Sequence, residues 1–167
     1  MIVSRNPITV QGKVFLERKL QKMRNRKPDL MNEVVEAQKK GDFSENFEYY
    51  AAKKELRELD AEIQELDAYI NSAMVVPLSL NPTLACFGSK VTLLKDSEPV
   101  SYIILGEREA EPLCGSLSSS SPLFQLFAAK KVGYTASLNG HEYTLTKISP
   151  VTETEVESVL AATEKLV

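Results

Sequence analysis

Apolar residues recur at alternating intervals of four and three along two long stretches of the chain. The first series is Leu16, Leu20, Met23, Lys27, Leu30, Val34 and Ala37, and the second is Ala52, Leu56, Leu59, Ile63, Leu66, Ile70 and Ala73. This spacing keeps one seam of a helix facing a partner helix. Because only a short polar connection separates the two series, they predict an antiparallel helical hairpin with arms of about 30 residues, each roughly 45 Å long.

The hydrophobic pattern changes after Pro77. Residues 77–85 contain Pro77 and Pro82 and predict a linker, because proline keeps itself and the residue before it out of helical conformations. Short apolar runs then predict a helix at 123–129 and strands at 90–94, 100–105, 135–138 and 143–148. Turn residues between the runs, such as Asn139-Gly140, favour antiparallel pairing.

The predicted fold class is therefore α+β. An N-terminal coiled-coil hairpin occupies residues 1–76, a linker 77–85, and a small antiparallel β domain with a short helix 86–150. The remaining tail, 151–167, has Val156, Val159, Leu160 and Thr163 on one helical face, with Thr154 as the candidate N-cap.

Local signals predict where the hairpin helices begin and end. Pro28 lacks a backbone donor inside the first arm and predicts a break or bend at residues 25–27. Gly41 suits the left-handed conformation that commonly ends a helix. Ser44 is then the expected N-cap of the second arm.

Composition narrows the class of protein. The chain has 167 residues, 43% of them apolar, and two cysteines, Cys86 and Cys114. Residues 1–10 lack an apolar run with a cleavage pattern, so neither export nor a disulfide framework is expected. No window approaches the roughly 18 apolar residues that would span a bilayer. We expect a cytoplasmic monomer that binds no membrane.

The connection between the helices carries the most specific motif. It reads Gly41-Asp42-Phe43-Ser44-Glu45-Asn46-Phe47-Glu48-Tyr49, followed by Ala51-Ala52. This segment resembles the bacterial transcript-cleavage factors GreA and GreB, whose signature there is Gly-Asp-hydrophobic-x-Glu-Asn-x-Glu-Tyr. The likeness extends over about residues 8–149 and recurs at Phe87-Gly88-Ser89-Lys90-Val91-Thr92, Ser121-Pro122-Leu123 and Lys130-Lys131-Val132-Gly133.

The resemblance implies a function in trans. In that family the hairpin tip enters the secondary channel of bacterial RNA polymerase, where its acids help hold the second catalytic Mg²⁺ and orient water for attack on the nascent RNA of a backtracked complex. Those roles fall on Asp42 and Glu45, with Gly41, Asn46, Glu48 and Tyr49 as supporting tip residues. The protein would have no cofactor of its own, share Mg²⁺ with the polymerase, and be no enzyme alone.

The resemblance also implies a second domain like the FK506-binding proteins that docks on the rim of the polymerase channel. The docking candidates are Ser121, Pro122, Leu123 and Phe124. Here the chain departs from the family, which usually has Gly where Phe124 stands and Gly again where Ala129 precedes the basic pair. A bulkier, more apolar helix edge is therefore expected.

The residues themselves support a metal role only in part. Asp42 and Glu45 lie three apart across the predicted turn, and a hard cation such as Mg²⁺ prefers oxygen ligands. Two carboxylates are too few for a tight site, so further ligands would have to come from elsewhere. The alternative is a solvated acidic turn. Tyr49 is expected to pack beneath the turn, while Glu48 caps the helix or faces solvent.

Charge is distributed unevenly along the two arms. Between residues 13 and 27 seven basic residues stand against Glu17 alone, and between 55 and 67 six acidic residues stand against Arg57. With the turn centred near Phe43, these runs lie side by side and predict ion pairs that flank the seam. The alternative is a basic patch that contacts RNA or polymerase, as in the family.

Three functional classes remain open on sequence alone. The first is a transcript-cleavage factor, and the second is a related non-cleaving inhibitor of polymerase. Asp42 and Glu45 match the cleaving pattern rather than the altered turn of inhibitory relatives. The third is a peptidyl-prolyl isomerase with a coiled-coil arm, although the second half is short of aromatic residues for a proline pocket.

Overall fold

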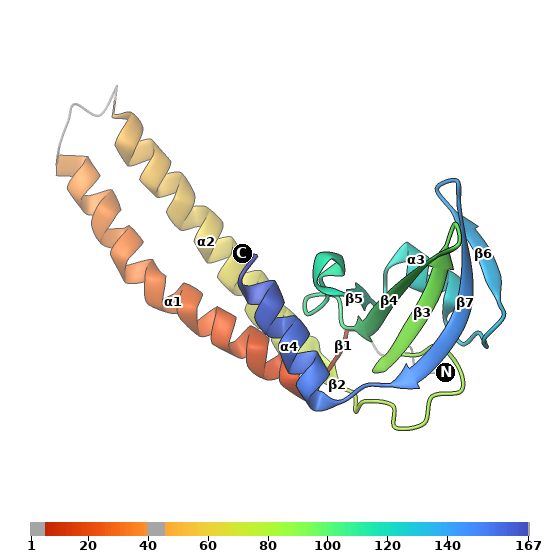
Figure 1. Cartoon of the computed structure of the whole chain (residues 1–167). Coiled ribbons are helices and arrows are strands. Elements are labelled where there is room, and N and C mark those ends of the chain that lie inside the picture. Colours follow the sequence, from red (N-terminus) through yellow and green to blue (C-terminus); the bar gives the residue numbers. More distant parts are fainter. Residues whose placement is uncertain (1–5, 40–45, 167) are drawn as a thin grey trace. The chain divides into compact units, whose positions relative to one another are not determined.

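The computed structural model describes residues 6–39 and 46–166 (Figure 1). The chain forms two compact units: Leu16–Ser72, and a second unit made of Met1–Phe15 together with Ala73–Val167. The sequence-based bounds placed residues 6–15 and 73–76 with the hairpin, whereas their packing groups them with the sheet. Within the described ranges, no helix is long and apolar enough to cross a membrane.

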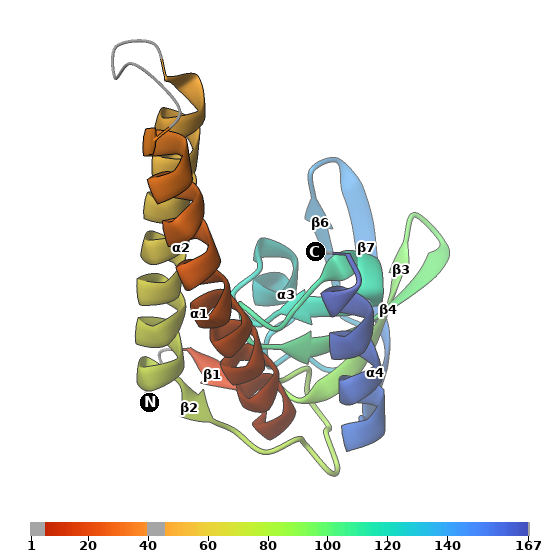
Figure 2. The ribbon, with the colours of Figure 1, turned by 90° about the vertical axis from the view of Figure 1, so that its left-hand side faces the viewer.

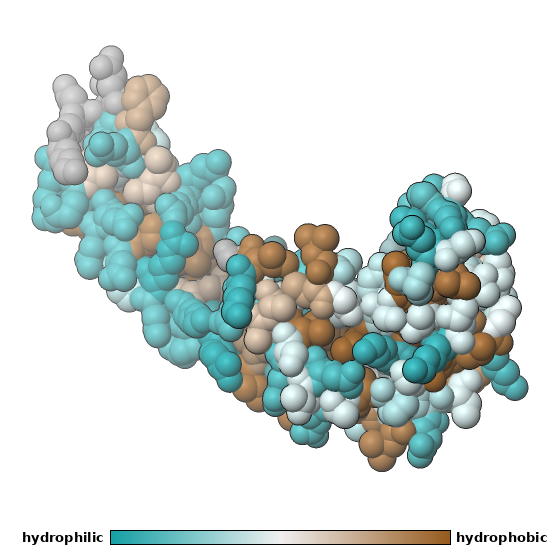
Figure 3. Space-filling model, in the orientation of Figure 1, coloured by the Kyte–Doolittle hydropathy of each residue, from teal (hydrophilic) through white to brown (hydrophobic). Residues whose placement is uncertain are grey.

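The hairpin unit contains α1, Val10–Lys39, from Leu16 onward, and all of α2, Phe47–Ser72. The two helices run antiparallel and side by side (Figure 2), which confirms the predicted hairpin. Its buried residues fall on the predicted seam, with Tyr69 added: Leu16, Leu20, Leu30, Ala37, Leu59, Leu66, Tyr69 and Ile70. The outward faces are mainly hydrophilic (Figure 3), as an amphipathic helix pair in water requires.

Ion pairs between the two arms confirm the interpretation of the charged runs. Arg24 Nη2 lies 3.1 Å from Asp67 Oδ1, Lys27 Nζ lies 2.6 Å from Asp60 Oδ1, and Arg26 pairs with Glu55. The side chains of these pairs are 36% to 61% exposed. Such exposed pairs each contribute only about 0.2–1 kcal/mol, so they fix the register more than they stabilise the unit.

Of the break or bend predicted at residues 25–27, the break is wrong, because α1 continues through Pro28, and the bend stays a prediction. Pro28 is exposed, so its ring faces solvent rather than the partner helix. Pro28 supplies no N–H to the carbonyl of Arg24, one turn earlier. A proline at this surface position therefore costs stability without ending the helix.

The other unit is built on a sheet of five strands: β3, Ser89–Lys95; β4, Glu98–Leu105; β5, Ser116–Ser118; β6, Thr135–Leu138; and β7, His141–Pro150. Their order is β5-β4-β3-β7-β6. The strand pairs are antiparallel except β4 with β5, which is parallel. The predicted strands are confirmed, and β5 was missed because it is short and serine-rich.

Two tight turns explain the antiparallel pairing. Asp96 and Ser97 have φ of 47° and 79° between β3 and β4, and Asn139 and Gly140 have φ of 52° and 81° between β6 and β7. Two consecutive residues with positive φ match the right-handed twist of the flanking strands. The sequence signal at Asn139-Gly140 was therefore sufficient for the turn between β6 and β7.

One face of the sheet is covered by α3, Pro122–Phe127, which is drawn behind β4 and β3 in Figure 1. Phe124 and Phe127 from this helix pack with Val91, Leu93, Ile104, Tyr143 and Leu145 from the strands. A short helical turn, Pro112–Cys114, precedes β5. The apolar alternation of β3 and β7 thus fills the core beneath α3.

The tail forms α4, Glu153–Glu164. Val156 and Leu160 pack with Ile103 and Leu105 of β4, and Phe15 and Leu78 lie against the same cluster. The N-cap is Thr152, not the predicted Thr154: Thr152 Oγ1 accepts from the Glu155 amide and the Glu155 carboxylate accepts from the Thr152 amide. This reciprocal capping box satisfies two free donors of the first turn.

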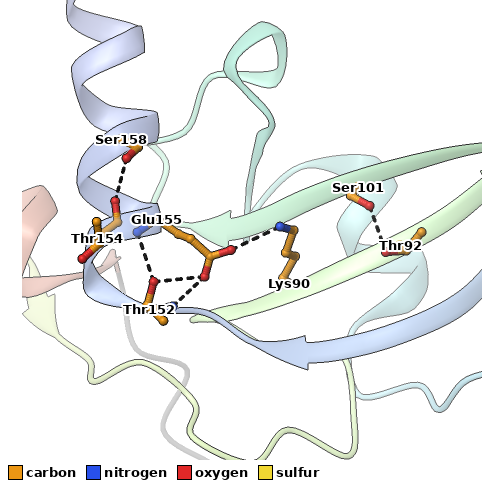
Figure 4. Close-up of polar contacts among 7 residues, drawn as sticks. All are labelled: Lys90, Thr92, Ser101, Thr152, Thr154, Glu155 and Ser158. Carbon is orange, nitrogen blue, oxygen red and sulfur yellow. Dashed lines mark hydrogen bonds and ion pairs between the residues drawn. The ribbon is translucent and has the colours of Figure 1, made fainter.

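Polar contacts join α4 to the sheet (Figure 4). Lys90 Nζ of β3 donates to Glu155 Oε1 over 3.3 Å, and Ser158 Oγ donates to the Thr154 carbonyl over 2.8 Å. The Glu155 carboxyl has its pKa lowered, first by the Thr152 backbone hydrogen bond and then by Lys90. One carboxylate therefore both caps the helix and ties it to β3.

Candidate functional site

The helix ends nearest the motif are Lys39, where α1 ends, and Phe47, where α2 begins. Gly41, Asp42, Phe43, Ser44 and Glu45 lie outside the described residues. The convergence of Asp42 and Glu45 on one cation therefore stays a prediction. What the structure describes is the immediate support of that segment.

Asn46 directly precedes α2, and its side chain bonds both helices. Its Oδ1 accepts from the Tyr49 amide over 3.0 Å, and its Nδ2 donates to the Ala37 carbonyl over 2.6 Å. Its own carbonyl accepts from the Tyr50 amide over 3.2 Å. Because Asn46 directly precedes α2 and its side chain bonds the third helical amide, it is the N-cap, and the prediction of Ser44 for that role is wrong.

The first turn of α2 presents an aromatic and charged surface. Tyr49 is half-buried, its ring meets Tyr50 edge-on at 5.5 Å, and Lys53 Nζ lies 5.4 Å from its centroid. Phe47 is 85% exposed. Tyr49 thus packs along its own helix, through Tyr50 and Lys53, and its predicted place beneath the turn stays a prediction.

Glu48 faces solvent, one of the two alternatives predicted for it. It is exposed and lines a shallow hollow of about 240 Å³ with Glu33, Glu36, Ala37 and Ala52. A negative charge in the first turn of α2 interacts favourably with the helix dipole. In the described parts of the chain, no group of three or more His, Cys, Asp or Glu side chains is arranged to hold a metal ion.

The docking candidates form the start of α3. Ser121 is the N-cap, with Oγ accepting from the Phe124 amide over 3.2 Å, Pro122 is exposed, and Leu123 is half-buried. Phe124 is only 5% exposed and belongs to the core. The expectation of a bulkier, more apolar edge is therefore wrong for Phe124, whose ring is not at the surface. Contact of the other three with a polymerase stays a prediction.

Ala129, just before the basic pair, has a backbone conformation that glycine adopts more easily. Its φ is 58°, in the left-handed region, and its amide donates to the Ala85 carbonyl over 2.9 Å. Glycine adopts this conformation without steric cost, whereas alanine does so at roughly 1–2 kcal/mol. The substitution strains the backbone after α3 but leaves the chain path intact.

Sequence reasoning missed a buried polar cluster around Glu109, a residue with 0% exposure. Its carboxylate accepts from the Thr9 amide at 3.1 Å, the Thr9 hydroxyl at 2.9 Å and the Gly106 amide at 2.8 Å. Thr9 Oγ1 in turn accepts from the Gly12 amide, as an N-cap of α1 does. Burial raises the pKa of Glu109, although the three hydrogen bonds oppose that effect.

The Glu109 cluster has a structural role. A Cβ on Gly12 would lie 1.3 Å from Glu109 Oε2. The absence of a side chain at Gly12 therefore leaves room for the Glu109 carboxylate against the helix. The neighbouring strands β1, Pro7–Ile8, and β2, Met74–Val75, pair in parallel. This cluster was not predicted, because strands of two residues show no periodic pattern in the sequence. The contact between Thr9 and Glu109, which are 100 positions apart, shows none either.

The chain is similar to known transcription factors over most of its length. Residues 6–75 match the GreA/GreB family model described as "Transcription elongation factor, N-terminal". The chain is 34% identical over 139 residues to transcription elongation factor GreA of Limosilactobacillus fermentum, covering 79% of this chain and 86% of that protein. It is 36% identical over 132 residues to GreA of Novosphingobium aromaticivorans, covering 78% and 84%.

Solved structures include a similar chain. The GreA factor homolog 1 (Gfh1) of Thermus thermophilus is 24% identical, with a TM-score of 0.40, over 85% of this chain and 97% of that chain.

Proposed function

Because the chain belongs to the GreA/GreB family of transcription elongation factors, we propose that it binds bacterial RNA polymerase and stimulates cleavage of the 3′ end of backtracked nascent RNA. The hairpin tip enters the secondary channel of the polymerase and brings Asp42 and Glu45 to the active site. The observation that supports this most is a two-helix arm in which Asn46 bonds both helix ends that flank the segment containing the two acids.

The tip supplies only part of a reactive site. Asp42 and Glu45 offer the carboxylate oxygens that suit a hard cation, and these two residues would hold the Mg²⁺ shared with the polymerase. A bound Mg²⁺ stabilises negative charge on phosphoryl oxygens and lowers the pKa of bound water. The protein's own residues orient these groups at the channel, and the remaining ligands come from the polymerase, so the protein alone has no cleavage activity and no cofactor.

The sheet unit provides attachment. We place the docking contact at the start of α3, where Ser121 and Pro122 lie at or near the surface and Leu123 is half-buried. A docked unit raises the effective concentration of the tethered tip at the channel. The protein acts in the cytoplasm as a monomer. Size-exclusion chromatography with light scattering tests the monomeric state directly.

The function is tested with a stalled, backtracked polymerase complex in the presence of Mg²⁺. The protein should shorten the RNA, whereas the protein alone should cleave none. Asp42→Asn and Glu45→Gln keep size but remove the charge, so each should lower the single-turnover rate at saturating factor on the order of a hundredfold, equivalent to about 3 kcal/mol.

Both variants should still compete with the wild-type protein for polymerase. Wild-type rates from both variants would show that the acids form a solvated turn. Slowed transcription without any RNA shortening by the wild-type protein would replace the cleavage function with that of a non-cleaving inhibitor.

A further inference from the structure

In the hairpin, the side chain of Asn46 forms a hydrogen bond at the end of α1 and another at the start of α2. Helices leave the last four carbonyls and the first four amides without intrahelical partners. Ala37 is in the last turn of α1 and Tyr49 in the first turn of α2, and Asn46 bonds the carbonyl of the former and the amide of the latter. Ala37 is 7% exposed, so water is a poor substitute at its carbonyl.

We infer that Asn46 is a positioning residue that clasps the two helices together and thereby sets where the tip carboxylates are held. This inference rests on the proposed function and deepens it. The six residues 40–45, which include Asp42 and Glu45, connect Lys39 to Asn46, so the clasp holds together the two helix ends that flank this segment. Closing a segment at fixed ends removes much of its conformational freedom.

The chemistry of the amide explains the residue type. Asn, Asp and Ser cap helices about equally well, because each offers an oxygen to the first-turn amides. Only asparagine among them also has an N–H₂ donor at the distance of the Ala37 carbonyl. Asp has no donor when ionised, and the Ser hydroxyl lies one bond closer to the backbone than Asn46 Nδ2. The position therefore requires a cap that donates as well as accepts.

Groups that take part in a reaction must be placed accurately. Misplacement of a reacting group by about 1 Å can cost a hundredfold in rate. A loss of the clasp therefore affects the reaction step more than binding, which involves other surfaces. This separation distinguishes positioning from a general role in folding.

Two variants test the inference: Asn46→Asp and Asn46→Ser. Both keep the cap of α2 and lose the bond to Ala37, but only the first adds a negative charge. At saturating factor, each should slow RNA cleavage in the backtracked complex about tenfold, as expected for one lost hydrogen bond. The factor concentration that gives half-maximal cleavage should stay within about twofold of the wild-type value. The helix content should not change.

A matched control is Asn71→Asp, an exposed position in the last turn of α2, which should cleave at the wild-type rate. A second readout needs no polymerase. In the wild-type protein, nuclear magnetic resonance should detect a scalar coupling across the hydrogen bond, between Asn46 Nδ2 and the Ala37 carbonyl carbon.

Wild-type saturating rates from both Asn46 variants would overturn the inference, as would absence of the coupling. A slow Asp variant beside a fully active Ser variant would also overturn it, because charge would then be the cause. An inactive wild-type protein that shows the coupling would overturn the proposed function and the catalytic consequence of the clasp, while the clasp itself would stand.

Discussion

Gly12→Ala tests the fit between α1 and the Glu109 carboxylate. In an ordinary helix interior this substitution stabilises by about 1 kcal/mol. Here the new Cβ would meet Glu109 Oε2 at 1.3 Å and Thr9 Oγ1 at 2.9 Å. The carboxylate must therefore move away from the Thr9 amide, the Thr9 hydroxyl and the Gly106 amide.

The magnitude follows from those three hydrogen bonds. Hydrogen bonds to a charged group contribute about 1.5–3 kcal/mol each, and we take about 1 kcal/mol, the typical value for a neutral pair, as the lower limit here. Losing three at the lower limit and gaining the helix preference of alanine gives a net destabilisation of at least about 2 kcal/mol. We expect a value of about 2–4 kcal/mol.

The assay is urea unfolding followed through amide resonances of β3 and β7, which report the sheet unit. Glu109→Ala supplies the second arm of a double-mutant cycle. In that background the clash with the carboxylate is absent and only the 2.9 Å approach to Thr9 Oγ1 remains, so most of the cost of Gly12→Ala should disappear. A neutral or stabilising effect of Gly12→Ala in the wild-type background would refute the reasoning.

Two further predictions concern the sheet unit. Ala129→Gly should raise the unfolding free energy of the sheet unit by about 1 kcal/mol, because it relieves the left-handed strain at φ 58°. An unchanged urea midpoint would contradict this. The control is Ala161→Gly at an exposed position in α4, which should destabilise the unit. Burial raises the pKa of Glu109 above its ordinary 4.5, so the folded state binds more protons and the unfolding free energy should fall as pH rises from about 4.5 through the folded pKa. Glu109→Gln should abolish that part of the pH dependence, and parallel curves for both proteins would disprove it.

The sequence predicted the long-range architecture where a periodic pattern was present. The seam from Leu16 to Ala37 and its partner from Ala52 could be read because each position repeats the same demand for burial. The strands of the sheet were readable for the same reason, with Asn139-Gly140 marking a turn whose backbone few other pairs adopt. The break at Pro28 was wrongly predicted because its cost depends on which side of the helix faces solvent, and that is a property of packing.

The candidate site was predictable as a motif and not as a geometry. The sequence pointed to Asn46 as a supporting residue by resemblance, but its bond to Ala37 depends on how two helices approach each other. Glu109 and Thr9 could not be paired in advance, since a single contact between residues 100 positions apart has no pattern. Phe124 looked like a surface residue because α3 is too short to show a periodic face.

The sheet unit is discontinuous in sequence, and this has a consequence for synthesis on the ribosome. Residues up to Phe15 belong to it, yet their partners begin at Ala73. The hairpin between them is contiguous and rich in local contacts, and such segments fold quickly. The arm should therefore be complete while the N-terminal segment still waits for Met74, Glu109 and α4 to emerge. If whole heptads were added to the arm, the N-terminal segment would pair with these partners later, by the time needed to translate the added residues at about 5–20 residues per second. The contacts within the sheet unit would not change.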